Sequence, residues 1–377
     1  MNTEIHATYA ARRARIAGWL RDRGIAAAVF EDREGRRDPT VRYLSGQPGD
    51  SFLLVTAAGR GILVSWDVNM AQAMAGVDEI LAYGDFERRP VRAVLGVLAR
   101  EGIGPGAQVE LPSTLAYPEY IRYAEEGVDY DFLCREDGAD EFARGLRAVK
   151  DDFEIAVYRR ASAITDELID ALEAGVRKGT ISTEADAALF LERESRARGC
   201  ESMGFETLSA GPARSFGIHA FPAYTAGGFG TRGLSILDFG VCREGYTTDV
   251  TLTFVRGPVS PAQERMIALV EEAYREAAGM LRPGVPTVEI SRRVDEMFAA
   301  GGFKMPHALG HGIGLEAHEA PAMRNRDDNP WVLAPGHVVT LEPGLYDPEA
   351  GGVRLENDFL IGPGGAEALT RSRIVRL

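Results

Sequence analysis

The chain has 377 residues, 45% hydrophobic and 26% charged, which is enough for about two globular domains with buried cores. Its formal net charge of -14 argues against general affinity for nucleic acid or anionic membrane, because both require basic patches. Three widely spaced cysteines predict reduced thiols rather than a disulfide framework. No apolar run approaches the roughly 20 residues that span a bilayer, and the N-terminal segment lacks a signal-peptide pattern. We therefore expect a cytoplasmic protein without a membrane or nucleic-acid partner.

The first 140 residues alternate between helical and strand patterns. Helices are expected at residues 3–24, 90–101 and 118–126, and short apolar strands at residues 25–30, 51–56, 61–66, 79–83 and 108–111. Such alternation predicts an α/β domain over residues 1–140. Its charged side chains are scattered, so we expect them to face solvent and assign no chemistry to this domain.

The second domain is expected over residues 141–377. A charged segment of helical period, residues 140–172, contains or directly follows the domain boundary. A helix at about 182–198 has Ser182 and Thr183 as cap candidates, and later helices begin at Pro261 and near Thr287. A loop rich in glycine and proline, which contains His219, follows a strand at 205–209.

The segment 233–257 predicts two strands joined by a turn at 243–245. Asp238 and Asp249 are expected inside these strands, although aspartate is depleted in strands and a buried carboxylate costs several kcal/mol unless it is paired. The pair indicates a metal site or a catalytic dyad. From this segment alone, the alternative that one aspartate faces solvent and the other caps a turn stays open.

A second pair of acids follows two helices later. Glu342 ends one apolar strand pattern and Glu356 lies within another, and His311 is expected in a glycine-rich loop between the two acidic pairs. Four carboxylates at close range would raise one another's pKa values unless a cation neutralised them. Carboxylates with one imidazole suit a pair of divalent ions such as Mn, Co, Fe or Zn, whereas structural zinc sites favour Cys and His. The repeat of acidic strand pairs predicts a pseudo-twofold arrangement.

The motifs DFG, TTDVT, GHGIGLEAHE, LEPGLY and GVRLEND, in this order, resemble those of the pita-bread metallopeptidases, and within them the Xaa-Pro dipeptidase (prolidase) and aminopeptidase P branch. The resemblance covers residues 146–377. It implies a creatinase/prolidase-like N-terminal α/β domain before a pita-bread catalytic domain, which is an α+β fold with a curved antiparallel sheet. It also implies two divalent ions, with Mn placed first, and a homodimer. The activity implied is hydrolysis of Xaa-Pro peptide bonds, chiefly in dipeptides, by a hydroxide that bridges the ions.

The same resemblance assigns roles to single residues. Asp238 would chelate one ion, His311 and Glu342 the other, and Asp249 and Glu356 would bridge both. The residues that it implies for catalysis are His219, His318 and Glu342.

Substrate contacts are expected from histidines and arginines around these ligands. His219 and His318 would contact the substrate, and His307 would support the site from close by or contact substrate as well. Arg354 lies two residues before Glu356 in a strand pattern, so both side chains are expected on one face, where Arg354 would orient the carboxylates or meet substrate. Arg324 is expected to clamp the far carboxylate of a dipeptide.

Several positions depart from the family's pattern. Leu252 and Ala322 stand where an arginine is common, and Ile218 stands where proline usually precedes the histidine. A metal-dependent relative of the creatinases that acts on a small non-peptide metabolite therefore remains the alternative function. The complete ligand set argues against a third possibility, a binding module without activity. His337 is expected on the surface at the start of a strand, and Arg326 as a solvated charge beside two aspartates.

Overall fold

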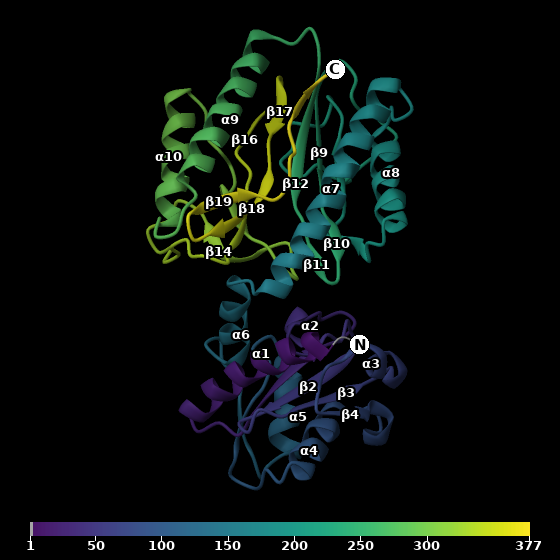
Figure 1. The fold of residues 1–377 in the computed structure, drawn as a ribbon, viewed down its shortest axis with the longest axis vertical. Coiled ribbons are helices and arrows are strands. Elements are labelled where there is room, and N and C mark those ends of the chain that lie inside the picture. Colours follow the sequence, from purple (N-terminus) through teal and green to yellow (C-terminus); the bar gives the residue numbers. More distant parts are fainter. Residues whose placement is uncertain (1–2) are drawn as a thin grey trace. The chain divides into compact units, whose positions relative to one another are not determined.

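The computed structural model describes residues 3–377, which divide into two compact units, residues 3–147 and residues 148–377. Each unit has its own sheets and helices (Figure 1). Among the helices of residues 3–377, none combines the length and apolar character that a membrane crossing needs.

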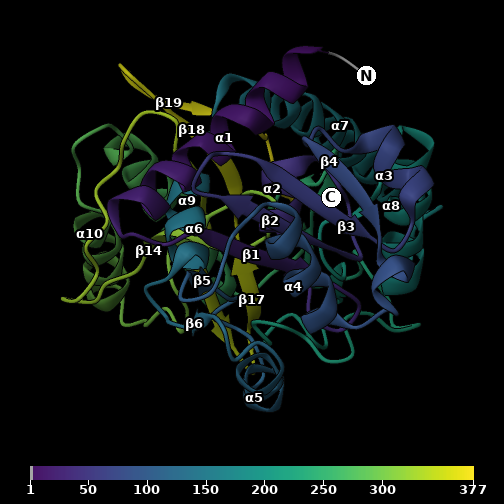
Figure 2. The ribbon, with the colours of Figure 1, turned by 90° about the horizontal axis from the view of Figure 1, so that it is seen from below.

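The N-terminal unit is built on a six-stranded mixed sheet with the order β4-β3-β2-β1-β5-β6. The strands are β1 (Ala27–Asp32), β2 (Ser51–Thr56), β3 (Gly61–Ser65), β4 (Glu79–Ala82), β5 (Gln108–Glu110) and β6 (Asp131–Leu133). β2 pairs antiparallel with β1 and β3, and the other neighbours are parallel. In Figure 2, β3 and β4 lie side by side, as their register requires.

Helices connect these strands. They are α1 (Thr3–Asp22), α2 (Pro39–Ser45), α3 (Val68–Met74), α4 (Pro90–Arg100), α5 (Tyr117–Glu126) and α6 (Ala139–Ala148). The predicted α/β character of this unit is confirmed. Two helices, α2 and α3, were not predicted, because seven residues hold too few apolar repeats to be told from a loop.

The predicted helical segment 140–172 is two helices rather than one. α6 ends at Ala148, and α7 runs from Asp152 to Lys178. Asp151 caps α7 by accepting from the Glu154 amide at 3.0 Å, while the Glu154 side chain accepts from the Asp151 amide at 2.9 Å. This capping box starts a new helix where the charge pattern alone suggested continuity.

Two largely antiparallel sheets form the centre of the C-terminal unit. One sheet has the order β20-β12-β9-β8 and the other has the order β14-β13-β15-β18-β19. In the first sheet, β12 is parallel to β20 and antiparallel to β9. The strands of the first sheet are β8 (Leu208–Ala210), β9 (Gly233–Phe239), β12 (Val250–Arg256) and β20 (Ile374–Arg376). Those of the second are β13 (Gly310–Gly312), β14 (Glu319–Met323), β15 (Val338–Leu341), β18 (Asn357–Gly362) and β19 (Gly365–Ala368).

Smaller strands and four helices complete this unit. β7 (Ser202–Met203), β10 (Val241–Arg243) and β11 (Tyr246–Thr247) form one small sheet, and β16 (Gly344–Asp347) and β17 (Gly351–Arg354) form another. The helices are α7, α8 (Glu184–Ala197), α9 (Pro261–Met280) and α10 (Thr287–Ala300). In Figure 1, α7 and α8 lie on one side of β9, β12 and β17, and α9 and α10 lie on the other.

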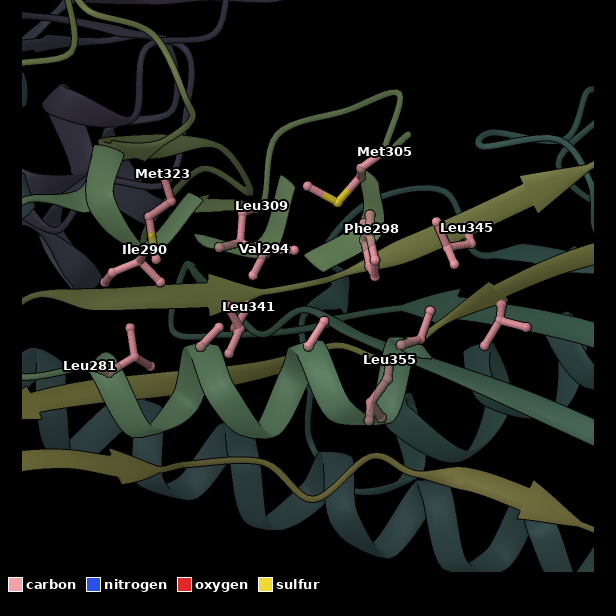
Figure 3. Close-up of a cluster of buried hydrophobic side chains, with 14 of the residues drawn as sticks. Leu281, Ile290, Val294, Phe298, Met305, Leu309, Met323, Leu341, Leu345 and Leu355 are labelled. Carbon is pink, nitrogen blue, oxygen red and sulfur yellow. The ribbon is translucent and has the colours of Figure 1, made fainter. Parts of the chain in front are cut away.

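Apolar side chains hold the helices against the strands. The buried cluster around α9 and α10 includes Ile290, Val294 and Phe298 from α10, with Leu341 and Leu345 from the strand region. Figure 3 shows these side chains gathered between helix and strands. Burying each such side chain contributes about 1.5–3 kcal/mol, so this packing holds β15 and β16, between which Glu342 lies, against α10.

Candidate metal centre

A cavity of about 620 Å³ in the C-terminal unit gathers the sequence-predicted acids and histidines. All five predicted metal ligands line it. His219, His307, His318 and Arg324 line the same cavity.

Strand register brings the acids together. Asp238 in β9 lies opposite Thr251 in β12, and Thr251 in turn forms an isolated bridge with Glu356. Three prediction details were wrong. Asp249 lies directly before β12 rather than inside it, Glu356 lies in the break between β17 and β18, and His311 lies in the short strand β13 rather than in a loop. At the two breaks, Asp249 and Glu356 are free of the strict side-to-side alternation of a continuous strand, and both line the cavity.

His311 has the tautomer and direction of a metal ligand. Its Nδ1 donates to the Gly312 carbonyl at 3.0 Å, which leaves Nε2 with a free lone pair. Nε2 lies 3.6 Å from Glu342 Oε1 and 3.8 Å from Asp249 Oδ2. One potential ligand atom from each of His311, Asp249 and Glu356 lies within 4.8 Å of the others.

The electrostatics of this cluster call for positive charge. Burial and the neighbouring Glu356 raise the pKa of Asp249 well above its usual range, and burial with Glu356 does the same for Glu342. Burial and Asp238 raise the pKa of Glu356 to about 7, while burial lowers the pKa of His311 to about 4. The carboxylates repel one another when ionised, and bound divalent ions would neutralise their charge. The neutral imidazole of His311 would add a nitrogen ligand to these oxygen ligands.

An unsatisfied oxygen supports the same conclusion. Asp238 Oδ1 is buried and has no hydrogen-bond partner among residues 3–377, although Asp238 lines the cavity. A buried carboxylate oxygen without a donor is costly. The residues present therefore fit divalent metal ions, with Asp249, His311 and Glu356 as the candidate core of the site and Asp238 and Glu342 beside them on the same cavity wall.

Arg354 holds the other side of Asp238. The Arg354 side chain is 1% exposed and does not line the cavity. One of its terminal nitrogens donates to Asp238 Oδ2, and its Nε donates to Thr251 Oγ1 at 2.9 Å. The other terminal nitrogen donates to the Tyr346 hydroxyl at 2.7 Å and to the Ile218 carbonyl at 3.1 Å. These contacts favour the orienting role over the alternative that Arg354 meets substrate.

Sequence reasoning missed two residues that orient the ligands. Asp358 accepts from the backbone amide of Asp249 at 3.1 Å. Thr251 donates to Glu356 Oε2 at 2.7 Å. Strand alternation would have found Asp358, which is two residues after Glu356, whereas nothing local in the sequence indicates the role of Thr251.

The three non-ligand histidines differ in exposure. His219 and His318 are exposed on the cavity wall, and the His318 ring centroid lies 4.2 Å from that of His311. His307 is half-buried, its Nδ1 donates to the Ala308 carbonyl at 2.8 Å and its Nε2 lies 3.0 Å from the Tyr346 hydroxyl. Tyr346 therefore joins His307 to Arg354, a connection that the sequence did not suggest.

The two arginines after β14, Arg324 and Arg326, differ in their surroundings. Arg324 is exposed and lines the cavity, whereas Arg326 is exposed and pairs with Asp328 at 2.7 Å, as expected.

The prediction of a surface position for His337 was wrong. Only 3% of His337 is exposed, and its ring lies 6.2 Å from that of Trp331. The reason is long-range pairing, because His337 forms an isolated bridge with Val149. Next to this bridge, the Lys150 amide donates to the Gly336 carbonyl at 2.8 Å.

Comparison with known proteins agrees with this geometry. The profile of Metallopeptidase family M24 matches residues 156–363. The chain is 32% identical over 343 residues to an Xaa-Pro dipeptidase of Pyrococcus horikoshii, covering 89% of this chain and 91% of that one. An Xaa-Pro dipeptidase structure from Bacillus anthracis is similar with a TM-score of 0.83 and 25% identity, covering 98% of this chain and 100% of that one. An X-Pro aminopeptidase structure from Thermotoga maritima has a TM-score of 0.82 and 25% identity, covering 97% and 99%.

These similarities extend over both units and confirm the expected fold, an N-terminal α/β domain followed by a pita-bread domain. They also confirm the family that the motifs resembled, and with it a metal-dependent hydrolase that acts on peptides. The chain belongs to metallopeptidase family M24.

Proposed function

We propose that this protein hydrolyses Xaa-Pro peptide bonds, chiefly in dipeptides, with two divalent ions. The observation that carries the proposal is one cavity lined by the five-residue donor set together with His219, His318 and Arg324. The similarity to an Xaa-Pro dipeptidase at 32% identity supports the choice of substrate. Mn remains our first expectation for the ions, and a homodimer remains a prediction.

The five ligands would hold the ions and leave the exposed histidines for the substrate. When bound, the ions supply an activated water at neutral pH and polarise the scissile carbonyl. Glu342, whose side chain is 18% exposed beside His311, would accept a proton at a carboxylate oxygen and return it to the leaving nitrogen. His318 and His219 would donate hydrogen bonds to the oxygen that gains charge in the transition state.

Arg324 would set the length of the substrate. Its exposed side chain lines the cavity, and a guanidinium can hold a carboxylate with two parallel hydrogen bonds. A free carboxylate directly after the proline would meet this cation in a dipeptide, whereas a longer peptide would present an amide. Arg324 therefore gives the physical reason to place dipeptides before longer peptides.

A substrate panel tests the proposal. Purified protein is given Xaa-Pro dipeptides, Xaa-Pro-Xaa tripeptides and creatine-like amides, each with Mn, Co, Zn or Fe added to metal-free protein. We expect turnover of the dipeptides to exceed that of the tripeptides. Turnover confined to the creatine-like amides would instead support the alternative function, a metal-dependent hydrolase or lyase of a small non-peptide metabolite, which the departures at Leu252 and Ala322 keep open.

A further inference from the structure

The loop between β8 and β9 carries His219, and Arg354 at the end of β17 contacts it next to this histidine by donating to the Ile218 carbonyl at 3.1 Å. Residues 211–228 contain no helix or strand, and both His219 and Phe221 are exposed. Phe221 is 95% exposed although it lines the cavity. Ala220 packs against the buried cluster of Leu208, Ala210 and Ile236, and contacts where the two ends of the loop meet add to this restraint.

A single carboxylate lies at that meeting point. Glu184 is the first residue of α8 and is 1% exposed. On the incoming side of the loop, its Oε1 accepts from the Gly211 amide at 2.7 Å and from Arg214 Nε at 3.1 Å. On the outgoing side, its Oε2 accepts from the Thr225 amide at 2.7 Å and from the Thr225 hydroxyl at 2.6 Å.

Backbone amides at the start of α8 also donate hydrogen bonds to this loop. The Glu184 amide donates to the Gly227 carbonyl at 2.9 Å, and the Ala185 amide donates to the Thr225 carbonyl at 2.9 Å. The first amides of a helix have no intrahelical acceptor, so here the loop supplies the acceptors. The Glu184 carboxylate and the helix start therefore hold the same few loop residues from two directions.

The two ends of the loop touch through backbone atoms. A Cβ atom built at Gly211 would lie 2.0 Å from the Gly228 carbonyl oxygen, so only glycine allows this approach. Arg214, held by Glu184, also reaches across the loop and donates to the Pro222 carbonyl at 2.7 Å. Pro222 follows the exposed Phe221, so the link runs from the carboxylate to the part of the loop that borders the cavity.

We propose that Glu184 is a positioning residue that closes the loop 211–228 and thereby holds His219 in the active-site cavity. Glu184 does not line the cavity itself, and it acts only through the loop. The inference rests on the proposed function, because His219 must contact substrate for its position to affect turnover. Burial disfavours the charge of Glu184, yet the bonds from Thr225 and Gly211 outweigh burial and lower its pKa, so the carboxylate is ionised at neutral pH.

The test replaces Glu184 by glutamine. E184Q keeps the side-chain shape but turns one acceptor oxygen into a donor that faces N–H or O–H groups of the loop. E192Q is the matched control, because Glu192 lies on the same helix, its side chain is 45% exposed, and among the described residues it forms an ion pair only with Arg196, at 2.9 Å. Three quantities are measured for each protein: bound metal, amide hydrogen exchange of peptides within 211–228, and kcat/KM for an Xaa-Pro dipeptide.

We expect E184Q to bind as much metal as wild type, to exchange at least tenfold faster within 211–228, and to lose about tenfold to a hundredfold in kcat/KM, while E192Q changes none of these. E184Q in an H219A background should cost no more than about twofold further, because the loop then has no histidine to position. Unchanged exchange in the loop, or an equal loss in the H219A background, would overturn the proposal. If wild type cleaves no Xaa-Pro substrate, the proposed function fails, and hydrogen exchange still decides whether Glu184 closes the loop.

Discussion

Replacing Arg354 by methionine should destabilise the C-terminal unit more than a typical substitution. The variant removes hydrogen bonds from Arg354 to Thr251, Tyr346 and Ile218, which contribute about 1 kcal/mol each. It also leaves Asp238 without its cation, and breaking one partner of a buried pair costs about 3–5 kcal/mol. Because the two contributions overlap, we expect the free energy of unfolding to fall by about 3–5 kcal/mol in total, which lowers Tm by roughly 6–20 °C.

The measurement can be confined to the unit that contains the change. The protein has three tryptophans, and only Trp331 belongs to residues 148–377. A W19F/W66F background therefore lets Trp331 fluorescence report unfolding of this unit in guanidinium, with EDTA present so that metal affinity does not contribute. R326M is the control, since Arg326 is exposed, and it should match wild type. A loss below about 1 kcal/mol in R354M would refute the role given to this buried network.

Three further predictions concern the histidines and Arg324. H311A should bind metal more weakly, whereas H219A and H318A should keep nearly all their metal and lose roughly 100-fold or more in turnover; an H318A protein that lacks metal would reverse our division between ligands and substrate groups. R324A should raise KM for Xaa-Pro dipeptides by about tenfold to a hundredfold and affect tripeptides less, and equal losses on both would exclude the clamp. Burial lowers the pKa of His337 to about 4, below its unfolded value of about 6.5, so the unfolded state binds more protons between these values and stability falls as pH drops from 6.5 to 4. Between pH 7.5 and 4.5 the free energy of unfolding, measured in urea, should fall by about 2.5 kcal/mol less in H337Q than in wild type. An equal fall in both proteins would contradict this.

The metal ligands could be predicted because buried acids are conspicuous in a sequence. Asp238 and Glu356 interrupt apolar strand patterns, and burial without a partner is costly enough that such residues need an explanation. The exact strand ends could not be predicted. Asp249 and Glu356 lie in short breaks that depend on the register between β9, β12 and the chain after β17, and register is a property of paired strands rather than of either segment alone.

Long-range polar contacts were the part that sequence could not reveal. Glu184 reads as an ordinary acid in the first turn of a helix, yet its partners Gly211 and Thr225 are 27 and 41 residues away. His337 follows a Pro-Gly turn pattern at the start of a strand, which suggested a surface position, but only 3% of it is exposed. In each case the local sequence pattern is compatible with a surface position, and the residue is buried only because of tertiary packing.

The central claim is that five side chains hold two ions that the reaction requires. The most direct measurement compares metal content and dipeptide turnover of metal-loaded wild type and D249A, with D328A as control because Asp328 is exposed and pairs with Arg326. Wild type and D328A should bind about two divalent ions per chain and turn over equally. D249A should lose at least one ion and nearly all turnover. Full metal content and an unchanged rate in D249A would contradict the account.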